Sequence, residues 1–282
     1  MDFGAIISNS FKYPFKDLKN LGFVCLLFVL LLILPIGIYI KNSTAMTIGA
    51  VCLLIFILIV PGYNILVIKS GIDQSRKIPT IKVGRSIINT LKLLILDICY
   101  IAIPSIIACL ILLFATGLID YPMNIFKSIL DLNMTFTLDL ISGFLNAIGI
   151  TLIVTAIVRV IFTLLSCIAK ARLANSNRLT EALKIHKVIS DIKKIGFLKF
   201  IGWYIVIGIL LAIVNMIAFS LALFVHPACF IIYLCIVLPV IYIIYNYSLG
   251  LLYSNFKAGN GEDDDLEKFE RELMYLKYGL LH

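Results

Sequence analysis

Arg159 and Asp97 are charged side chains inside long apolar stretches, which makes them the first candidates for chemistry in this sequence. Placing an arginine at the centre of a bilayer costs roughly 2.5–3.5 kcal/mol, so such a residue is expected to face other helices and find a partner. Its long side chain can also extend toward the nearer membrane surface. We therefore predict that Arg159 pairs with Asp97 and joins two helices. Two separate charges, each extending toward the surface, are the alternative.

Threonines accompany Arg159 at intervals of four residues, which places them on one face of a helix. A polar row beside a buried arginine would suit a path for an anion or a lipid head group. Threonine hydroxyls also form hydrogen bonds with carbonyls of their own helix, so packing is the interpretation that we favour. The threonines of this candidate polar row are Thr151, Thr155 and Thr163.

Motifs of known catalytic and metal sites are absent from the sequence. It contains no G-x-S-x-G, no H-E-x-x-H and no phosphate-binding loop. The 7 cysteines include no C-x-x-C pair and the 3 histidines are scattered, so the spacing of metal ligands is missing. We therefore expect a protein that is not an enzyme, with no catalytic residues, no bound metal and no cofactor.

The composition places these residues in a membrane. The chain is 61% hydrophobic and 14% charged, whereas soluble domains are about half apolar and about a quarter charged. A helix needs roughly 20 apolar residues to cross the hydrocarbon core. We predict an all-α, polytopic membrane protein with one transmembrane domain over 1–256 and an acidic cytoplasmic tail over 257–282. The predicted transmembrane helices are 21–40, 45–68, 93–115, 140–168, 201–224 and 229–253.

A short basic segment with apolar residues at helical spacing precedes each pair of apolar stretches. Such a helix can lie in the membrane surface, with its apolar face in the lipid and its lysines toward the phosphates. The sequence therefore predicts three helical hairpins, each preceded by a basic amphipathic interfacial helix. The three segments are 3–20, 82–92 and 180–200.

Lysine and arginine are distributed unevenly between the two sides of this topology. The predicted outer loops hold only Lys41 and Lys127, and most of the other basic residues lie in the inner segments. This asymmetry predicts a multi-pass protein of the cell membrane with both termini in the cytoplasm. The basic surface would attract anionic lipid head groups, and no motif for nucleic acid accompanies it. The candidate lipid contacts are Lys184, Lys187, Lys193, Lys194 and Lys199.

Small residues form a stripe on the fifth apolar stretch. Small side chains let membrane helices approach closely, and an asparagine can form a hydrogen bond across the contact. We favour an internal packing face, and a homo-oligomer or an unknown membrane partner is the alternative. The stripe consists of Gly208, Ala212, Asn215, Ala218 and Ala222.

Short motifs in the first third of the chain resemble a known family. They are the pair Tyr13-Pro14 in the opening MDFGAIISNSFKYPFKDLKNLGF and the pair Gly62-Tyr63 in PGYNILVIKSGIDQSRKIP. In these the chain resembles a prokaryotic, mainly archaeal family of polytopic membrane proteins catalogued as domain of unknown function 4013. The resemblance covers the chain from end to end, implies a membrane fold and supplies no activity or functional residue.

Two functions suit these features. The first is a non-catalytic membrane protein that organises lipids or partners through a basic cytoplasmic surface. The alternative is a transporter or permease-like component that uses the polar row around Arg159.

Overall fold

The computed structural model describes residues 3–130, 134–224 and 227–255, and these residues are almost entirely helical, with no strand among them. The predicted tail, 257–282, lies outside the described residues. Among the described residues, six helices are long and apolar enough to cross a membrane, as the hydropathy of the sequence predicts. They are Leu18–Tyr39, Ser43–Ile72, Val83–Ala115, Asp139–Ser176, Phe197–Leu221 and Cys229–Asn255.

The chain divides into two compact units. The first contains Met1–Leu93 and Lys170–His282, and the second contains Leu94–Ala169.

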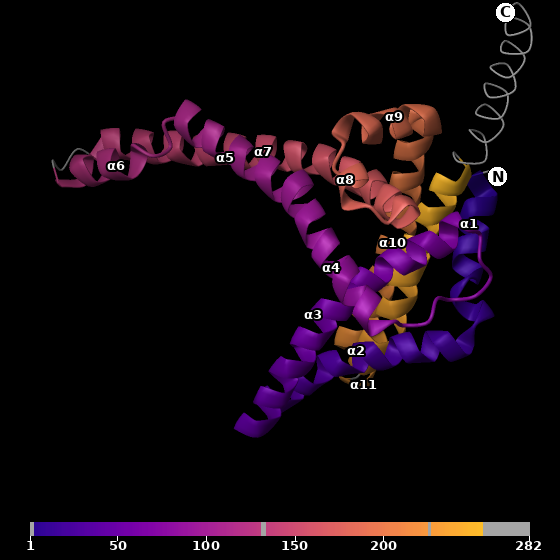
Figure 1. Cartoon of the computed structure of the whole chain (residues 1–282). Helices are drawn as coiled ribbons and strands as arrows, with labels where there is room; N and C mark the ends of the chain where they lie inside the picture. Colours follow the sequence, from indigo (N-terminus) through magenta and orange to yellow (C-terminus); the bar gives the residue numbers. More distant parts are fainter. Residues whose placement is uncertain (1–2, 131–133, 225–226, 256–282) are drawn as a thin grey trace, which may run out of the picture. The chain divides into compact units, whose positions relative to one another are not determined.

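The first unit begins with α1 (Phe3–Lys12), a short turn of 3₁₀ helix (Pro14–Lys16), α2 (Leu18–Tyr39) and α3 (Ser43–Ile72) (Figure 1). Asp17 caps α2 by accepting a hydrogen bond from the backbone of Asn20, and Asn42 caps α3 in the same way. A Cβ on Gly49 would overlap the backbone of Leu34, so α2 and α3 pack backbone against backbone.

Pro61-Gly62 interrupts the hydrogen bonding of α3 without unwinding it. The Thr90 hydroxyl lies in the opened turn: it accepts from the Gly62 N–H at 2.8 Å and donates to the Leu58 carbonyl at 2.7 Å. Thr90 belongs to α4 (Val83–Asp97), and a Cβ on Gly62 would overlap the Ser86 carbonyl oxygen. Gly62 is therefore required for the close crossing of α3 and the start of α4.

The predicted segment 82–92 is not a separate helix. A single helical stretch, Val83–Ala115, runs from α4 through a π-helical turn (Ile98–Ala102) into α5 (Ile103–Ala115). The helix continues through residue 93 because neither a glycine nor a proline nor a capping residue stands there to stop it, and the start of the membrane span at residue 93 stays a prediction.

The predicted segment 180–200 is divided in three. It contains α8 (Leu179–Ala182), α9 (Ile185–Ile195) and the start of α10 (Phe197–Phe224). Gly196 separates the last two helices with φ of +92°, a conformation that favours glycine. The last span follows as α11 (Pro227–Ile232), a π-helical turn (Tyr233–Val237) and a helix over 238–255.

The last span packs on α3 through buried polar groups and glycines. Asn246 donates to Asn64 at 2.9 Å, and Asn64 donates to the Tyr242 hydroxyl. One turn or more further along both helices, a Cβ on Gly71 or on Gly250 would overlap the backbone of the other helix. Both contacts advance in the same direction along the two helices, so α3 and the last span run parallel.

The second unit contains α5, α6 (Tyr121–Leu130) and the part of α7 (Met134–Ser176) that precedes residue 170. The Tyr121 ring lies 5.9 Å from the Phe144 ring and fills the space over Gly143, so α6 packs on α7. At the other end of the unit, Ser166 donates a hydrogen bond of 3.1 Å to Asp97.

Candidate functional site

The segment 73–82 between α3 and α4 is not helical, yet its backbone is held firmly. Four side chains from three distant parts of the first unit donate hydrogen bonds to four carbonyls of this loop, between Ser75 and Pro79. We call Tyr13, Asn20, Tyr63 and Tyr247 the tyrosine clamp. The bonds run from Tyr247 to Ser75 (3.1 Å), Tyr13 to Lys77 (2.8 Å), Asn20 to Ile78 (3.1 Å) and Tyr63 to Pro79 (3.0 Å).

Burial explains why tyrosine suits this role. Tyr13 and Tyr63 are each 1% exposed, and the ring of Tyr13 stacks on that of Tyr247 at 3.6 Å. A buried phenol needs a partner for its hydroxyl, and a loop carbonyl provides one. Burial also raises the pKa of Tyr13 above its ordinary value, so its hydroxyl stays neutral and remains a donor. The clamp therefore fixes the loop without any charge.

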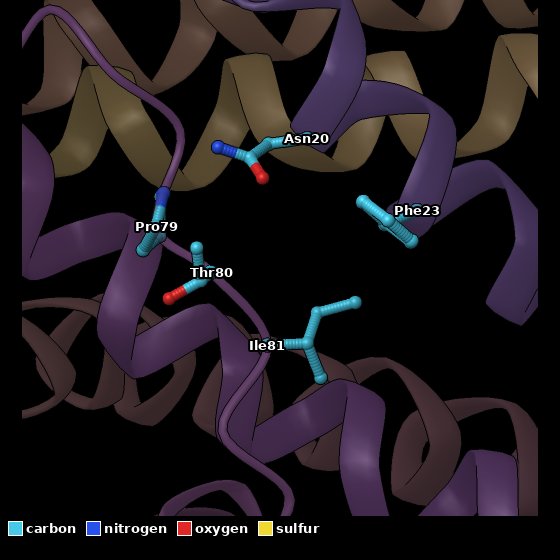
Figure 2. A pocket seen from close by; sticks show the side chains of 5 residues that line it. All are labelled: Asn20, Phe23, Pro79, Thr80 and Ile81. Carbon is cyan, nitrogen blue, oxygen red and sulfur yellow. The ribbon is translucent and has the colours of Figure 1, made fainter.

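The fixed loop forms one wall of an open pocket of about 220 Å³. Pro79, Thr80 and Ile81 face Asn20 and Phe23, which lie near the start of α2 (Figure 2). The Asn20 side chain therefore has two roles, since it belongs to the clamp and also lines the pocket.

A network of charged side chains holds a second region of the first unit. Arg172, near the end of α7, forms an ion pair of 2.6 Å with Asp191 on α9, which is only 6% exposed. Tyr253 of the last span donates to the same carboxylate oxygen at 3.0 Å. The Arg172 guanidinium also donates to the backbone carbonyl of Glu181 at 3.0 Å and lies 3.5 Å from its carboxylate. We call these four residues the ion network.

Glu181 also binds two of the lysines that were predicted to contact lipid. Lys184 lies 2.7 Å and Lys187 2.8 Å from its carboxylate oxygens. Hydrogen bonds from Lys184 and Lys187 lower the pKa of Glu181 from 4.5 to about 2. The charges of these two lysines are therefore partly neutralised.

The other predicted lipid lysines lie on a more open surface. Lys193, Lys194 and Lys199 are exposed, and neither Lys193 nor Lys199 forms an ion pair with a described residue. Large apolar side chains are exposed around them on α9 and the first turn of α10. These are Ile185 (46%), Ile189 (40%), Phe197 (60%) and Leu198 (83%), which with Lys193 and Lys199 make up what we call the α9–α10 surface.

Asp97 and Arg159 are not joined by a hydrogen bond or an ion pair among the residues that the structure describes. Asp97 accepts a hydrogen bond from Ser166, and Arg159 is exposed within its unit. Their pairing stays a prediction.

The hydroxyls of the threonine row differ in their hydrogen bonding. Thr163 donates to the Arg159 carbonyl at 2.7 Å, which is the bond within one helix that the packing interpretation expects. Thr151 is 5% exposed, and the hydroxyls of Thr151 and Thr155 have no hydrogen-bond partner in the described part of the chain.

The residues of the small-residue stripe also differ in their surroundings. Asn215 accepts a hydrogen bond of 2.8 Å from Tyr233, so its middle faces the last span. Gly208 and Ala212 are exposed, and a Cβ on Gly208 would meet open space. The side chain of Ala222 is outside the described residues.

Neither the tyrosine clamp nor the ion network is among the sites predicted from the sequence. The clamp could have been suspected, because the two motifs that carry the family resemblance, Tyr13-Pro14 and Gly62-Tyr63, contain two of its tyrosines. No local pattern links Arg172 to Asp191, which is 19 residues away.

Comparison with known proteins gives one match. The model of a family described as "Protein of unknown function (DUF4013)" matches residues 45–223. None of the curated proteins and none of the solved structures matches the chain.

Proposed function

The chain belongs to the DUF4013 family, an assignment that supplies no activity, and we propose that it is a non-catalytic protein of the cell membrane that binds anionic lipids through a cytoplasmic surface. Six apolar helices fit an integral membrane protein of unknown function, and the lipid role is our addition. The α9–α10 surface carries this proposal.

Charge and contacts support a cytoplasmic position for this surface. The ends of α7 and of the last span meet α9 at Asp191, and the end of α3 leads into the loop that Tyr13 holds. These contacts support a common side for the ends of the second, fourth and sixth spans. Because the lysines and arginines also concentrate there, we assign that side to the cytoplasm.

The arrangement of side chains on α9 supports contact with lipid. Val188 and Ile192 are buried, whereas Ile185 and Ile189 are exposed one turn apart, and Lys193 follows on the next turn. A helix at the membrane surface can place such isoleucines among acyl chains and such a lysine beside a phosphate. We propose that α1 and α9 lie in the membrane plane, whereas the start of α4 continues directly into its span, and that the six spans form three hairpins.

The test measures recruitment of fluorescent phosphatidylglycerol and phosphatidylcholine by the purified chain in detergent. Each lysine near an anionic surface contributes about 1 kcal/mol to the free energy of binding. Replacing Lys193 and Lys199 by glutamine should therefore weaken binding of phosphatidylglycerol about 30-fold. The matched control replaces Lys184 and Lys187, which should weaken binding less because Glu181 already pairs with both. Equal binding of the two lipids by the unaltered chain would refute the proposal.

The unpartnered hydroxyls of Thr151 and Thr155 favour a second candidate, a transporter or permease-like component. Buried hydroxyls without partners in the described structure could bind a solute that passes along α7 toward Arg159. Flux of small anions into vesicles that contain the protein, lost in Arg159→Gln, would support this candidate. Equal flux in both proteins would remove it.

A further inference from the structure

The pocket between α2 and the clamped loop is lined by the Asn20 side chain, and the hydrogen bonds of its amide fix which way the amide oxygen points. The Asn20 amide nitrogen donates to the Asp17 carboxylate at 2.7 Å and to the Ile78 carbonyl at 3.1 Å. Both partners accept hydrogen bonds and cannot donate them, so the nitrogen must face them. The amide oxygen is therefore turned toward the pocket, as Figure 2 shows. No described residue donates to this oxygen, so it can accept a hydrogen bond from a ligand.

The rest of the lining is largely apolar. Phe23, Pro79 and Ile81 surround the Asn20 oxygen, and the Thr80 methyl group also faces the space (Figure 2). A volume of about 220 Å³ is smaller than the roughly 300–1,000 Å³ of pockets that enclose drug-sized ligands. The pocket suits a fragment of the size of a lipid head group, with the remainder of the molecule outside.

The position of the pocket indicates that the part of the ligand outside it consists of acyl chains. Asn20 and Phe23 lie in the first turns of α2, a helix long and apolar enough to cross a membrane, and Phe23 is 55% exposed. Acyl chains can continue from the pocket along this exposed apolar side of α2. Lys19 and Lys82 are neighbours of lining residues in the sequence, are exposed, and form no ion pair with a described residue.

We propose that this pocket binds one molecule of an anionic phospholipid with a hydroxylated head group, such as phosphatidylglycerol. A head-group hydroxyl donates to the Asn20 oxygen, the phosphate lies between Lys19 and Lys82, and the acyl chains contact Phe23. The tyrosine clamp keeps the wall of the pocket in place. This site is separate from the α9–α10 surface, so either can fail without the other.

The experiment counts lipids bound to the purified full-length chain by native mass spectrometry during titration with phosphatidylglycerol. The test variant is Thr80→Trp, which fills the pocket from an exposed position whose hydroxyl has no partner among the described residues. The control is Thr44→Trp, at an exposed position in the first turn of α3. We expect Thr80→Trp to lower the affinity for the tightest-bound lipid at least tenfold, and Thr44→Trp to leave that affinity unchanged. Equal affinity in the two variants, both folded by thermal unfolding, overturns the proposal.

Three further arms identify the ligand and separate the two sites. Phosphatidic acid, which lacks the head-group hydroxyls, and zwitterionic phosphatidylcholine should each bind at least tenfold more weakly than phosphatidylglycerol. Soluble glycerol phosphate should not displace the lipid at equal concentration, and displacement would overturn the assignment to a lipid. Lys193→Gln with Lys199→Gln should retain this one bound lipid, and its loss would assign the lipid to the α9–α10 surface instead.

Discussion

Two parts of the first unit fasten a segment outside the spans to the ends of membrane helices, and they do so with different chemistry. The tyrosine clamp holds the loop 73–82 with neutral side chains that donate to backbone carbonyls. The ion network holds α8 and α9 with charges, centred on the nearly buried carboxylate of Asp191. Neutral hydrogen bonds depend little on salt and pH, whereas ion pairs near the surface depend on both. We therefore expect the loop 73–82 to keep its position when salt or pH changes, and α9, which carries the lysines, to respond to both.

Asp191→Asn should have the largest effect, because it leaves the Arg172 charge without its closest partner. Breaking a buried ion pair costs about 3–5 kcal/mol, and since the Arg172 side chain remains 18% exposed we expect about 3 kcal/mol. The measurement is unfolding of the purified protein by denaturant in detergent. Asp73→Asn, at an exposed position, is the control and should have no effect. A loss below about 1 kcal/mol would mean that the network does not hold α9 through charge.

Arg172→Lys sharpens the comparison, because it keeps the charge and removes the fork of donors. Arg172 donates through three nitrogens to Asp191 and to the carbonyl and carboxylate of Glu181. A lysine ammonium cannot match these directions from one atom. We expect a loss of about 2 kcal/mol in the same unfolding measurement, from hydrogen bonds to charged groups. Arg178→Lys, which is exposed, should be neutral, and full stability of Arg172→Lys would show that charge alone suffices.

Tyr13→Phe tests the other half of the comparison. It removes one hydroxyl and leaves the Lys77 carbonyl without that donor, while the stack on Tyr247 can remain. A lost hydrogen bond to a partly buried acceptor costs about 1 kcal/mol. This loss should be the same in low and high salt, unlike that of Asp191→Asn. Tyr39→Phe is the matched control, since Tyr39 is 87% exposed. A salt-dependent loss for Tyr13→Phe would contradict a neutral clamp.

The two regions also differ in how far the sequence predicts them. The six long apolar helices of the described residues follow from hydropathy, because lipid requires such helices whatever they pack against. The end of a helix depends on single residues. Nothing stops the helix at residue 93, whereas Gly196 divides a segment that was predicted to be one helix. The contacts within neither region could be predicted from a local sequence pattern. Tyr13 and Lys77 are 64 residues apart, and Glu181 contacts Lys187 across the break between α8 and α9.

Acidification should have the smallest effect, and in the charged region it acts through Glu181. The pKa of Glu181 is lowered to about 2 in the folded protein from an ordinary value of 4.5, so its ion pairs stabilise the fold fully above pH 4.5. That contribution is lost progressively as the pH falls from 4.5 toward 2, where the folded protein also takes up the proton. The melting temperature of the wild type should therefore fall more steeply than that of Glu181→Gln between pH 5 and pH 3. Tyr13→Phe should follow the slope of the wild type, since burial keeps Tyr13 neutral throughout this range. Parallel slopes for wild type and Glu181→Gln would show that Lys184 and Lys187 are not held by Glu181, and both lysines would then be as available to lipid as Lys193.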